Sequence, residues 1–139
     1  MPLSPAQAAL ARWLAIVPAA ALSWLAAFAA GVGLLALADR LCPREAMVSG
    51  MCTAPWYAAA ESAILCASTA LAALLMVGSA TWLAPSRKAV AAAVALALGS
   101  LYALASAWAT GAWAAGASAV AAGVATFWLA TQRAGQRPA

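Results

Sequence analysis

Long apolar stretches and short polar segments alternate along this chain. Each stretch holds the roughly 20 largely apolar residues that a helix needs to cross a bilayer. The stretches cover residues 13–38, 56–83, 89–109 and 112–131. The polar segments between and after them are residues 39–55, 84–88, 110–111 and 132–139. We therefore predict a single all-α membrane domain over residues 1–139, a polytopic transmembrane four-helix bundle.

The composition agrees with a bilayer as the surrounding solvent. Hydrophobic residues make up 68% of the chain and charged residues 7%, whereas soluble domains carry about 25% charged residues. Histidine is absent, and the acidic residues are Asp39, Glu45 and Glu61 alone. Most general acid–base chemistry and most metal sites therefore lack their usual side chains. We expect a non-enzymatic protein with no metal ion and no cofactor.

The basic residues stand singly or in one pair at the ends of the apolar stretches, so the net charge of +4 does not indicate nucleic-acid binding. Lysine and arginine concentrate instead in the cytoplasmic loops of membrane proteins. One set of helix ends carries Arg12, Arg87, Lys88, Arg133 and Arg137, and the other set carries Arg40 and Arg44. This distribution predicts that both termini are cytoplasmic and that the loop at residues 39–55 is periplasmic, in a bacterial inner (plasma) membrane.

The first apolar stretch also resembles a secretory signal peptide in outline, because Arg12 precedes it. The apolar core of a signal peptide usually spans about 7–15 residues, whereas this stretch runs for about 25 uncharged residues. We therefore expect it to remain in the protein as the first transmembrane helix.

The loop at residues 39–55 holds most of the distinctive side chains. Cys42 and Cys52 are its only cysteines and the expected compartment is oxidising, so we predict a disulfide that caps the loop. A redox pair is a weaker interpretation, because such pairs usually have C-x-x-C spacing and nine residues intervene here. Met47 and Met51 could complete a Cu(I) site with the cysteines, but that site and the disulfide need the same sulfur atoms.

Glu61 is the one acidic residue inside an apolar stretch. An ionisable group in a membrane segment is a candidate functional residue. At about 1.5 Å per residue, Glu61 lies some 7 Å below Trp56, within reach of headgroups, water or a loop arginine. We place it in a candidate interaction or ion site with Asp39, Arg40 and Arg44, and pairing with an arginine is the simpler interpretation.

Close helix packing in a membrane depends on small residues, because lipid is as apolar as the helices themselves. Gly116 and Gly123 are seven residues apart and share one face of the fourth predicted helix. Gly99 lies between Ala95 and Ala103 in the third. We predict that these glycines line contacts between helices.

Together these features favour a structural or accessory subunit of a membrane complex, or a homo-oligomer, that interacts through its cysteine loop and small-residue helix faces. The expected partners are the lipid bilayer and either another membrane protein or a second copy of this chain. A small transporter or channel with Glu61 at its outer entrance is the alternative. A conducting path needs polar side chains at successive depths of the membrane, and the predicted helices offer few. A lipid- or quinone-linked enzyme, with Arg40 and Arg44 facing an anionic headgroup, is the third interpretation.

Overall fold

The computed structural model describes residues 4–135, and the side chains of residues 4–132. Its long helices are α1 (Pro5–Arg40), α2 (Tyr57–Leu83), α3 (Lys88–Thr110) and α4 (Trp113–Gly135). Between α1 and α2 lie a 3-10 turn, η1 (Arg44–Ala46), and the short strands β1 (Met47–Val48) and β2 (Met51–Cys52). All four long helices are long and apolar enough to cross a membrane. The predicted all-α class is therefore confirmed, with one small antiparallel hairpin added.

The helix ends follow local capping as well as hydrophobicity. The helices α2 and α3 begin and end within one residue of the predicted stretches, but α1 begins at Pro5 rather than residue 13. Ser4 and Gln7 exchange side-chain and backbone hydrogen bonds in a capping box, with Pro5 at the first helical position. The helix α4 continues to Gly135, into the predicted tail. Residues 136–139 of that tail, with Arg137, lie outside the described residues.

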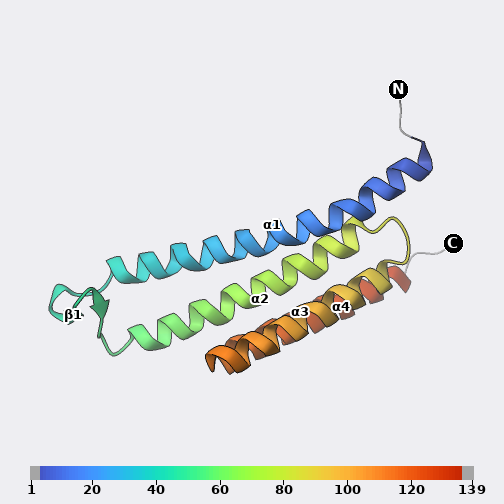
Figure 1. Ribbon diagram of the computed structural model, residues 1–139. Helices are drawn as coiled ribbons and strands as arrows, with labels where there is room; N and C mark the ends of the chain where they lie inside the picture. The colour runs from blue at the N-terminus through green and yellow to red at the C-terminus, as the bar shows by residue number, and fades with distance from the viewer. Residues whose placement is uncertain (1–3, 136–139) are drawn as a thin grey trace.

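The central helix of the molecule is α2. It packs against α1 and also against both α3 and α4, whereas α1 makes at most isolated contacts with α3 and α4. Figure 1 shows α1 on one side of α2 and the α3/α4 pair on the other. The four helices thus form an open arrangement around α2. Lipid solvates apolar helix faces, so no hydrophobic drive closes α1 onto α3.

Small residues form the packed interior, and the large apolar side chains point outward. The most deeply buried residues are Ala27, Val77, Ala80, Ala84, Ala92 and Ala107. Trp82 and Trp108, in contrast, are 77% and 80% exposed. In a bilayer such side chains meet lipid, and the helices gain stability from close backbone approach.

The two ends of the molecule differ in what they carry. Figure 1 places the N-terminal part of α1, the α2–α3 connection and the end of α4 together at one end. The hairpin and the α3–α4 link lie at the other, where Gly111 ends α3 with a φ of 75°. We call the first the basic end, for Arg12, Arg87 and Lys88, and the second the loop end.

Candidate functional site

Residues 41–56 fold into a compact unit at the loop end, which we call the loop cap. Cys42 and Cys52 are joined by a disulfide across this unit, with Cα atoms 6.0 Å apart. Their sulfur atoms are thus bonded to each other and not free to bind Cu(I) together. Within the described residues, no group of three or more His, Cys, Asp or Glu residues is arranged to hold a metal ion.

A tight hairpin shapes the middle of the loop cap. The strands β1 and β2 pair antiparallel, and the turn residues Ser49 and Gly50 have φ values of 52° and 82°. Positive φ at both positions is the type I′ geometry that suits a two-residue hairpin. Thr53 then donates from its backbone N–H and from its hydroxyl to the carbonyl of Ala46, both at 2.8 Å. These bonds hold the second strand against the 3-10 turn.

Asp39 and Tyr57 join the two helices that flank the loop cap. The phenol of Tyr57, the first residue of α2, donates to Oδ1 of Asp39 in the last turn of α1, at 2.5 Å. The partner of Asp39 is therefore a tyrosine rather than one of the arginines we grouped with it. Together with the disulfide, this bond fixes the end of α1 relative to the start of α2.

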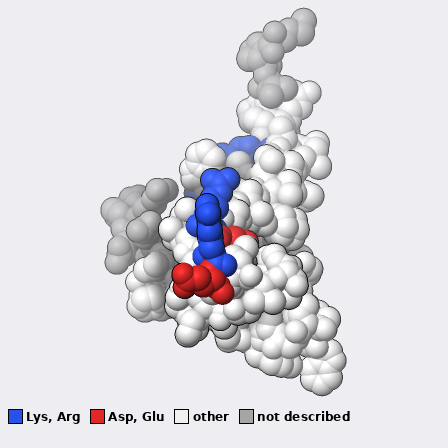
Figure 2. Space-filling view, turned by 90° about the vertical axis from the view of Figure 1, so that its left-hand side faces the viewer, with Lys and Arg blue, Asp and Glu red and all other residues white. Residues whose placement is uncertain are grey.

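Charged side chains of both signs gather at the loop end. Figure 2 looks onto this end and shows basic and acidic groups side by side on an otherwise uncharged face. Asp39, Arg40, Arg44 and Glu45 belong to this region and are all exposed. Because each arginine has an acidic neighbour in the chain, this surface suits a polar partner of mixed charge better than a simple anion.

Glu61 lies on α2, four residues after Tyr57. It is exposed and borders a shallow cavity of about 350 Å³ between the first turns of α2 and α4, together with Cys66 and Trp113. Among the described residues, neither Arg40 nor Arg44 comes within the 4.0 Å that an ion pair requires. The expected ion pair of Glu61 with an arginine is thus not seen, and its grouping with Asp39, Arg40 and Arg44 stays a prediction.

A groove of about 570 Å³ runs along the inner side of α3. It exists because α1 packs on α2 and does not reach across to α3. Trp24 forms its α1 wall, and Met76 and Val77 are among its α2 residues. Its α3 side carries a small residue at every fourth position, namely Ala95, Gly99, Ala103 and Ala107. Ala103 and Ala107 lie against Gly116 of α4, whereas nothing lies within 4 Å of a Cβ built on Gly99. A second helix could therefore approach the α3 backbone closely at Gly99.

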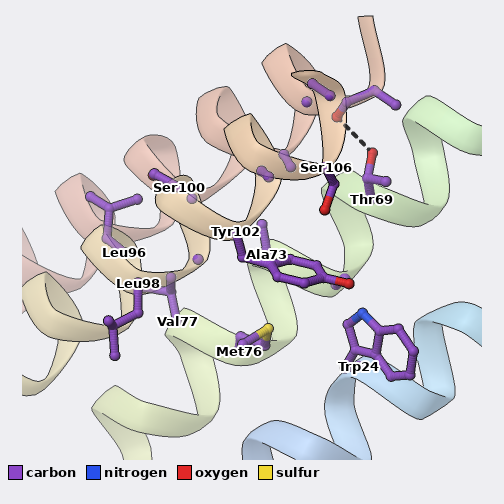
Figure 3. A pocket seen from close by; sticks show the side chains of 18 of the residues that line it. Trp24, Thr69, Ala73, Met76, Val77, Leu96, Leu98, Ser100, Tyr102 and Ser106 are labelled. Atoms are coloured by element: carbon purple, nitrogen blue, oxygen red, sulfur yellow. Dashed lines mark hydrogen bonds between the residues drawn. The ribbon is translucent and has the colours of Figure 1, made fainter. Parts of the chain in front are cut away.

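Two aromatic side chains with polar tips face this groove from opposite sides. Figure 3 shows Trp24 of α1 and Tyr102 of α3 pointing toward one another. Trp24 stacks on Phe28, one turn further along α1, with ring centroids 5.5 Å apart and an angle of 8° between the rings. The tyrosine ring is 63% exposed. An indole N–H and a phenol O–H thus supply the groove with hydrogen-bonding groups in a largely apolar setting.

A polar cluster connects α2 and α4 next to the groove. Thr69 Oγ1 lies 3.0 Å from Ser118 Oγ and 2.9 Å from the carbonyl oxygen of Ala115, the bond drawn in Figure 3. The Ser118 hydroxyl in turn lies 3.0 Å from the carbonyl oxygen of Cys66 on α2. Each hydroxyl has one proton, so the cluster offers alternative donor patterns. The hydroxyls can donate across to the other helix, to the carbonyl oxygens of Ala115 and Cys66, or back to carbonyl oxygens of their own helix.

Gly116 and Gly123 lie at close contacts of α4. A Cβ atom built on Gly116 would come 2.9 Å from the Cβ of Ala107 and 3.3 Å from the carbonyl oxygen of Ala103. One built on Gly123 would come 2.8 Å from Leu96 Cδ1. Both glycines thus lie where α4 approaches α3 most closely, as their shared face suggested.

Gly99 differs from the other two glycines that the sequence singled out. A Cβ on Gly99 would meet no atom within 4 Å, because this residue faces the groove. Gly31 of α1, which we did not include, is tightly packed instead: its Cβ would lie 2.6 Å from Ser68 Oγ. The small-residue pattern alone does not distinguish a filled contact from an empty one.

No protein-family model, curated protein or solved structure matches this chain. Its function is therefore argued from the geometry of the groove, the loop cap and the charged ends. The sequence analysis missed three parts of that geometry, namely the Thr69/Ser118 cluster, the Asp39–Tyr57 bond and a contact of Arg12 with the end of α2. Only the hydroxyl residues inside apolar stretches gave a signal for the first, because such residues tend to bond across helices.

Proposed function

We propose that the protein is a non-enzymatic integral membrane subunit that associates with a further transmembrane helix. That helix comes from a second copy of this chain or from a larger membrane complex. The observation that carries the proposal is the groove beside α3, where Gly99 leaves the backbone accessible while α1 stands apart. Small residues at four-residue spacing are the usual means by which membrane helices approach each other.

The loop cap supports the same function. Its disulfide and the Asp39–Tyr57 bond join the end of α1 to the start of α2, and α1 supplies the Trp24 wall of the groove. The mixed charges of Arg40, Arg44 and Glu45 give an exposed polar surface beside it. A partner could thus be recognised at two levels, by apolar packing within the bilayer and by polar contacts outside it.

The proposed orientation follows from charge. Arg12, Arg87 and Lys88 are at the basic end, and positive charge concentrates on the cytoplasmic side of membrane proteins. We therefore place both termini in the cytoplasm and the loop cap in the periplasm of a bacterial inner membrane. A periplasmic location is also compatible with a stable disulfide between Cys42 and Cys52.

The test is the size of the complex that mild detergent extracts from membranes for two leucine variants. Gly99→Leu fills the groove, and nothing lies within 4 Å of its added Cβ that would disturb the isolated fold. Gly33→Leu is the matched control, because its Cβ is equally free and Gly33 does not line the groove. We expect the wild type and Gly33→Leu to form the same complex and Gly99→Leu to run as the monomer. A monomeric wild type without a co-purifying protein, or an unchanged Gly99→Leu complex, would contradict the proposal.

A transport function is the second candidate, and the cavity beside Glu61 is the observation that favours it. An exposed carboxylate near the outer end of a span is a suitable first site for a proton or cation. Reconstitution into proteoliposomes with an entrapped pH dye would test this. Loss of proton flux in Glu61→Gln but not in Glu45→Gln would support transport, whereas the absence of flux in the wild type would rule out a transport function.

A further inference from the structure

The basic end carries positive charge that no acidic residue offsets. Arg12 lies on α1, and Arg87 and Lys88 lie at the start of α3. Every acidic residue of the chain falls between residues 39 and 61, in the last turn of α1, in the loop cap or in the first turns of α2. The two ends of the molecule therefore differ in kind, with mixed charges at the loop end and only positive charges at the basic end.

Arg12 is held in place by the end of α2. Its Nη2 donates to the carbonyl oxygen of Trp82 at 3.2 Å, one residue before α2 ends at Leu83. The last carbonyl groups of a helix have no partner within the helix, so a guanidinium group there is well placed. A guanidinium group has five N–H donors. The contact with Trp82 therefore fixes the position of Arg12 and leaves most of its donors free.

Arg87 and Lys88 follow shortly after Trp82, whose carbonyl oxygen Arg12 contacts. The α2–α3 connection brings the chain from Trp82 to Arg87 in five residues, which span at most about 18 Å even when extended. Arg87 has a left-handed backbone conformation, with φ 49° and ψ 43°, directly before the first turn of α3. The N-terminal end of α3 adds partial positive charge. Three cationic side chains thus border one short connection.

The position of these three residues relative to the bilayer indicates which kind of anion would bind them. Each lies directly before an uncharged apolar stretch, residues 13–38 or 89–109, at the level where a bilayer places its headgroups. Trp82, 77% exposed beside Arg12, is the type of side chain that favours this interface. An anionic lipid occupies this level at all times, whereas a soluble acidic segment would have to be brought to it. Charge complementarity thus favours a lipid headgroup.

We propose that the basic end is a binding site for the phosphate of an anionic phospholipid, held by Arg12, Arg87 and Lys88. The planar guanidinium groups suit two-point contact with phosphate oxygens, and the lysine ammonium adds a point charge. In the orientation proposed above, this headgroup belongs to the cytoplasmic leaflet, whose surface is negatively charged. The site is separate from the groove, so its test does not depend on a protein partner.

The test compares two double variants that remove the same charge from opposite ends. Purified protein in mild detergent is mixed with equal amounts of phosphatidylglycerol and phosphatidylcholine, and native mass spectrometry measures the bound ratio. The wild type and the control Arg40→Gln/Arg44→Gln are expected to prefer phosphatidylglycerol. Arg87→Gln/Lys88→Gln is expected to lose about 25-fold of that preference, the factor that two surface cations contribute.

If the double variant does not fold, the single variant Lys88→Gln replaces it in the test. Lys88 is the exposed first residue of α3. This single variant is expected to lose about fivefold of the preference. If the two double variants lost the phosphatidylglycerol preference equally, the proposal would be overturned, because net charge alone would then explain the binding. An unchanged preference in both basic-end variants would also overturn it. Binding of a soluble oligoglutamate peptide in place of phosphatidylglycerol, with the same dependence on Arg87 and Lys88, would show that the end recognises an acidic protein segment instead.

Discussion

At the scale of single residues, Gly116 and Gly99 make a direct comparison of filled and empty contacts. A methyl group on Gly116 meets the backbone carbonyl of Ala103 at 3.3 Å, and backbone cannot move aside as a side chain can. We expect Gly116→Ala to destabilise the protein by about 1–3 kcal/mol, a typical effect of overpacking. Denaturant unfolding in detergent micelles, followed by tryptophan fluorescence, measures this.

Gly99→Ala is the matched variant for that measurement. Its methyl group meets no atom within 4 Å, so no packing is disturbed. Replacing a helical glycine by alanine favours the helix by up to about 1 kcal/mol. We therefore expect unchanged or slightly higher stability. Similar losses in the two variants would mean that the α3–α4 contact is not located as described.

The Thr69/Ser118 cluster is expected to act as one unit. Hydrogen bonds between membrane helices contribute about 0.6 kcal/mol on average and up to about 1.7 kcal/mol. Thr69→Val and Ser118→Ala each remove the hydrogen bond between the two hydroxyls, so the double variant should lose less than the sum of the two. A double-mutant cycle of unfolding free energies measures the coupling.

Thr126→Val is the control for this cycle. Its hydroxyl donates to Ala122 within α4 and does not reach another helix. We expect it to show no coupling with Ser118→Ala. Strictly additive losses for Thr69→Val and Ser118→Ala would indicate that the two hydroxyls do not share a hydrogen bond.

Some of these residues could be predicted and others could not. Cys42 and Cys52 were predicted as a pair because they are the only cysteines of one loop. Thr69 and Ser118 are 49 residues apart, and Asp39 and Tyr57 are 18 apart. Such pairs depend on how the helices are rotated about their axes, and apolar stretches leave that rotation unspecified. The same uncertainty explains why Gly99 could not be distinguished from Gly123.

At the scale of elements, Arg12 is expected to stabilise the end of α2. Removing its guanidinium leaves the Trp82 carbonyl without this partner, at a cost of about 1 kcal/mol. We expect the last turn of α2 to open about fivefold more often in Arg12→Ala. Hydrogen exchange of the amides near Ala84 should rise accordingly. Unchanged exchange there, or an equal rise in Arg40→Ala, would contradict the role given to Arg12.

The disulfide is expected to stabilise the connection between α1 and α2. It closes a loop with a sequence separation of 10, for which the chain-entropy relation gives about 2.5–3 kcal/mol. Cys42→Ser/Cys52→Ser should lose stability of that order. Cys66, the free cysteine of α2, provides the control, and Cys66→Ala should change little. Equal stability of all three proteins would show that the bridge does not form.

The helices were the most predictable elements, because a bilayer requires long apolar spans whatever their packing. The start of α1 was missed since its first two turns depend on Ser4, Gln7 and Pro5 rather than on hydrophobicity. The strands β1 and β2 were missed because two residues each are too few to show an alternating pattern. The turn between them depends on positive φ at Ser49 as well as at Gly50, and serine gives no clear signal for it.

At the scale of the whole molecule, the sequence did not indicate how α1 and α2 lie relative to the adjacent helices α3 and α4. Alanine and glycine occur at four-residue spacing in several spans, so each span offers faces suitable for close packing. The structure selects α2 as the central helix and leaves the groove beside α3 open. A groove of this kind is difficult to infer from a chain whose apolar faces are all compatible with lipid.

If another protein helix occupies the groove in the membrane, site-specific photocrosslinking from within the groove should capture it. Leu98 lines the groove, whereas Leu101 of the same helix does not, and they are 63% and 66% exposed. A benzophenone side chain introduced at each position would be activated in intact membranes. We predict a discrete protein adduct from position 98 and none from position 101. The same products from both positions, or lipid adducts alone from position 98, would contradict the account.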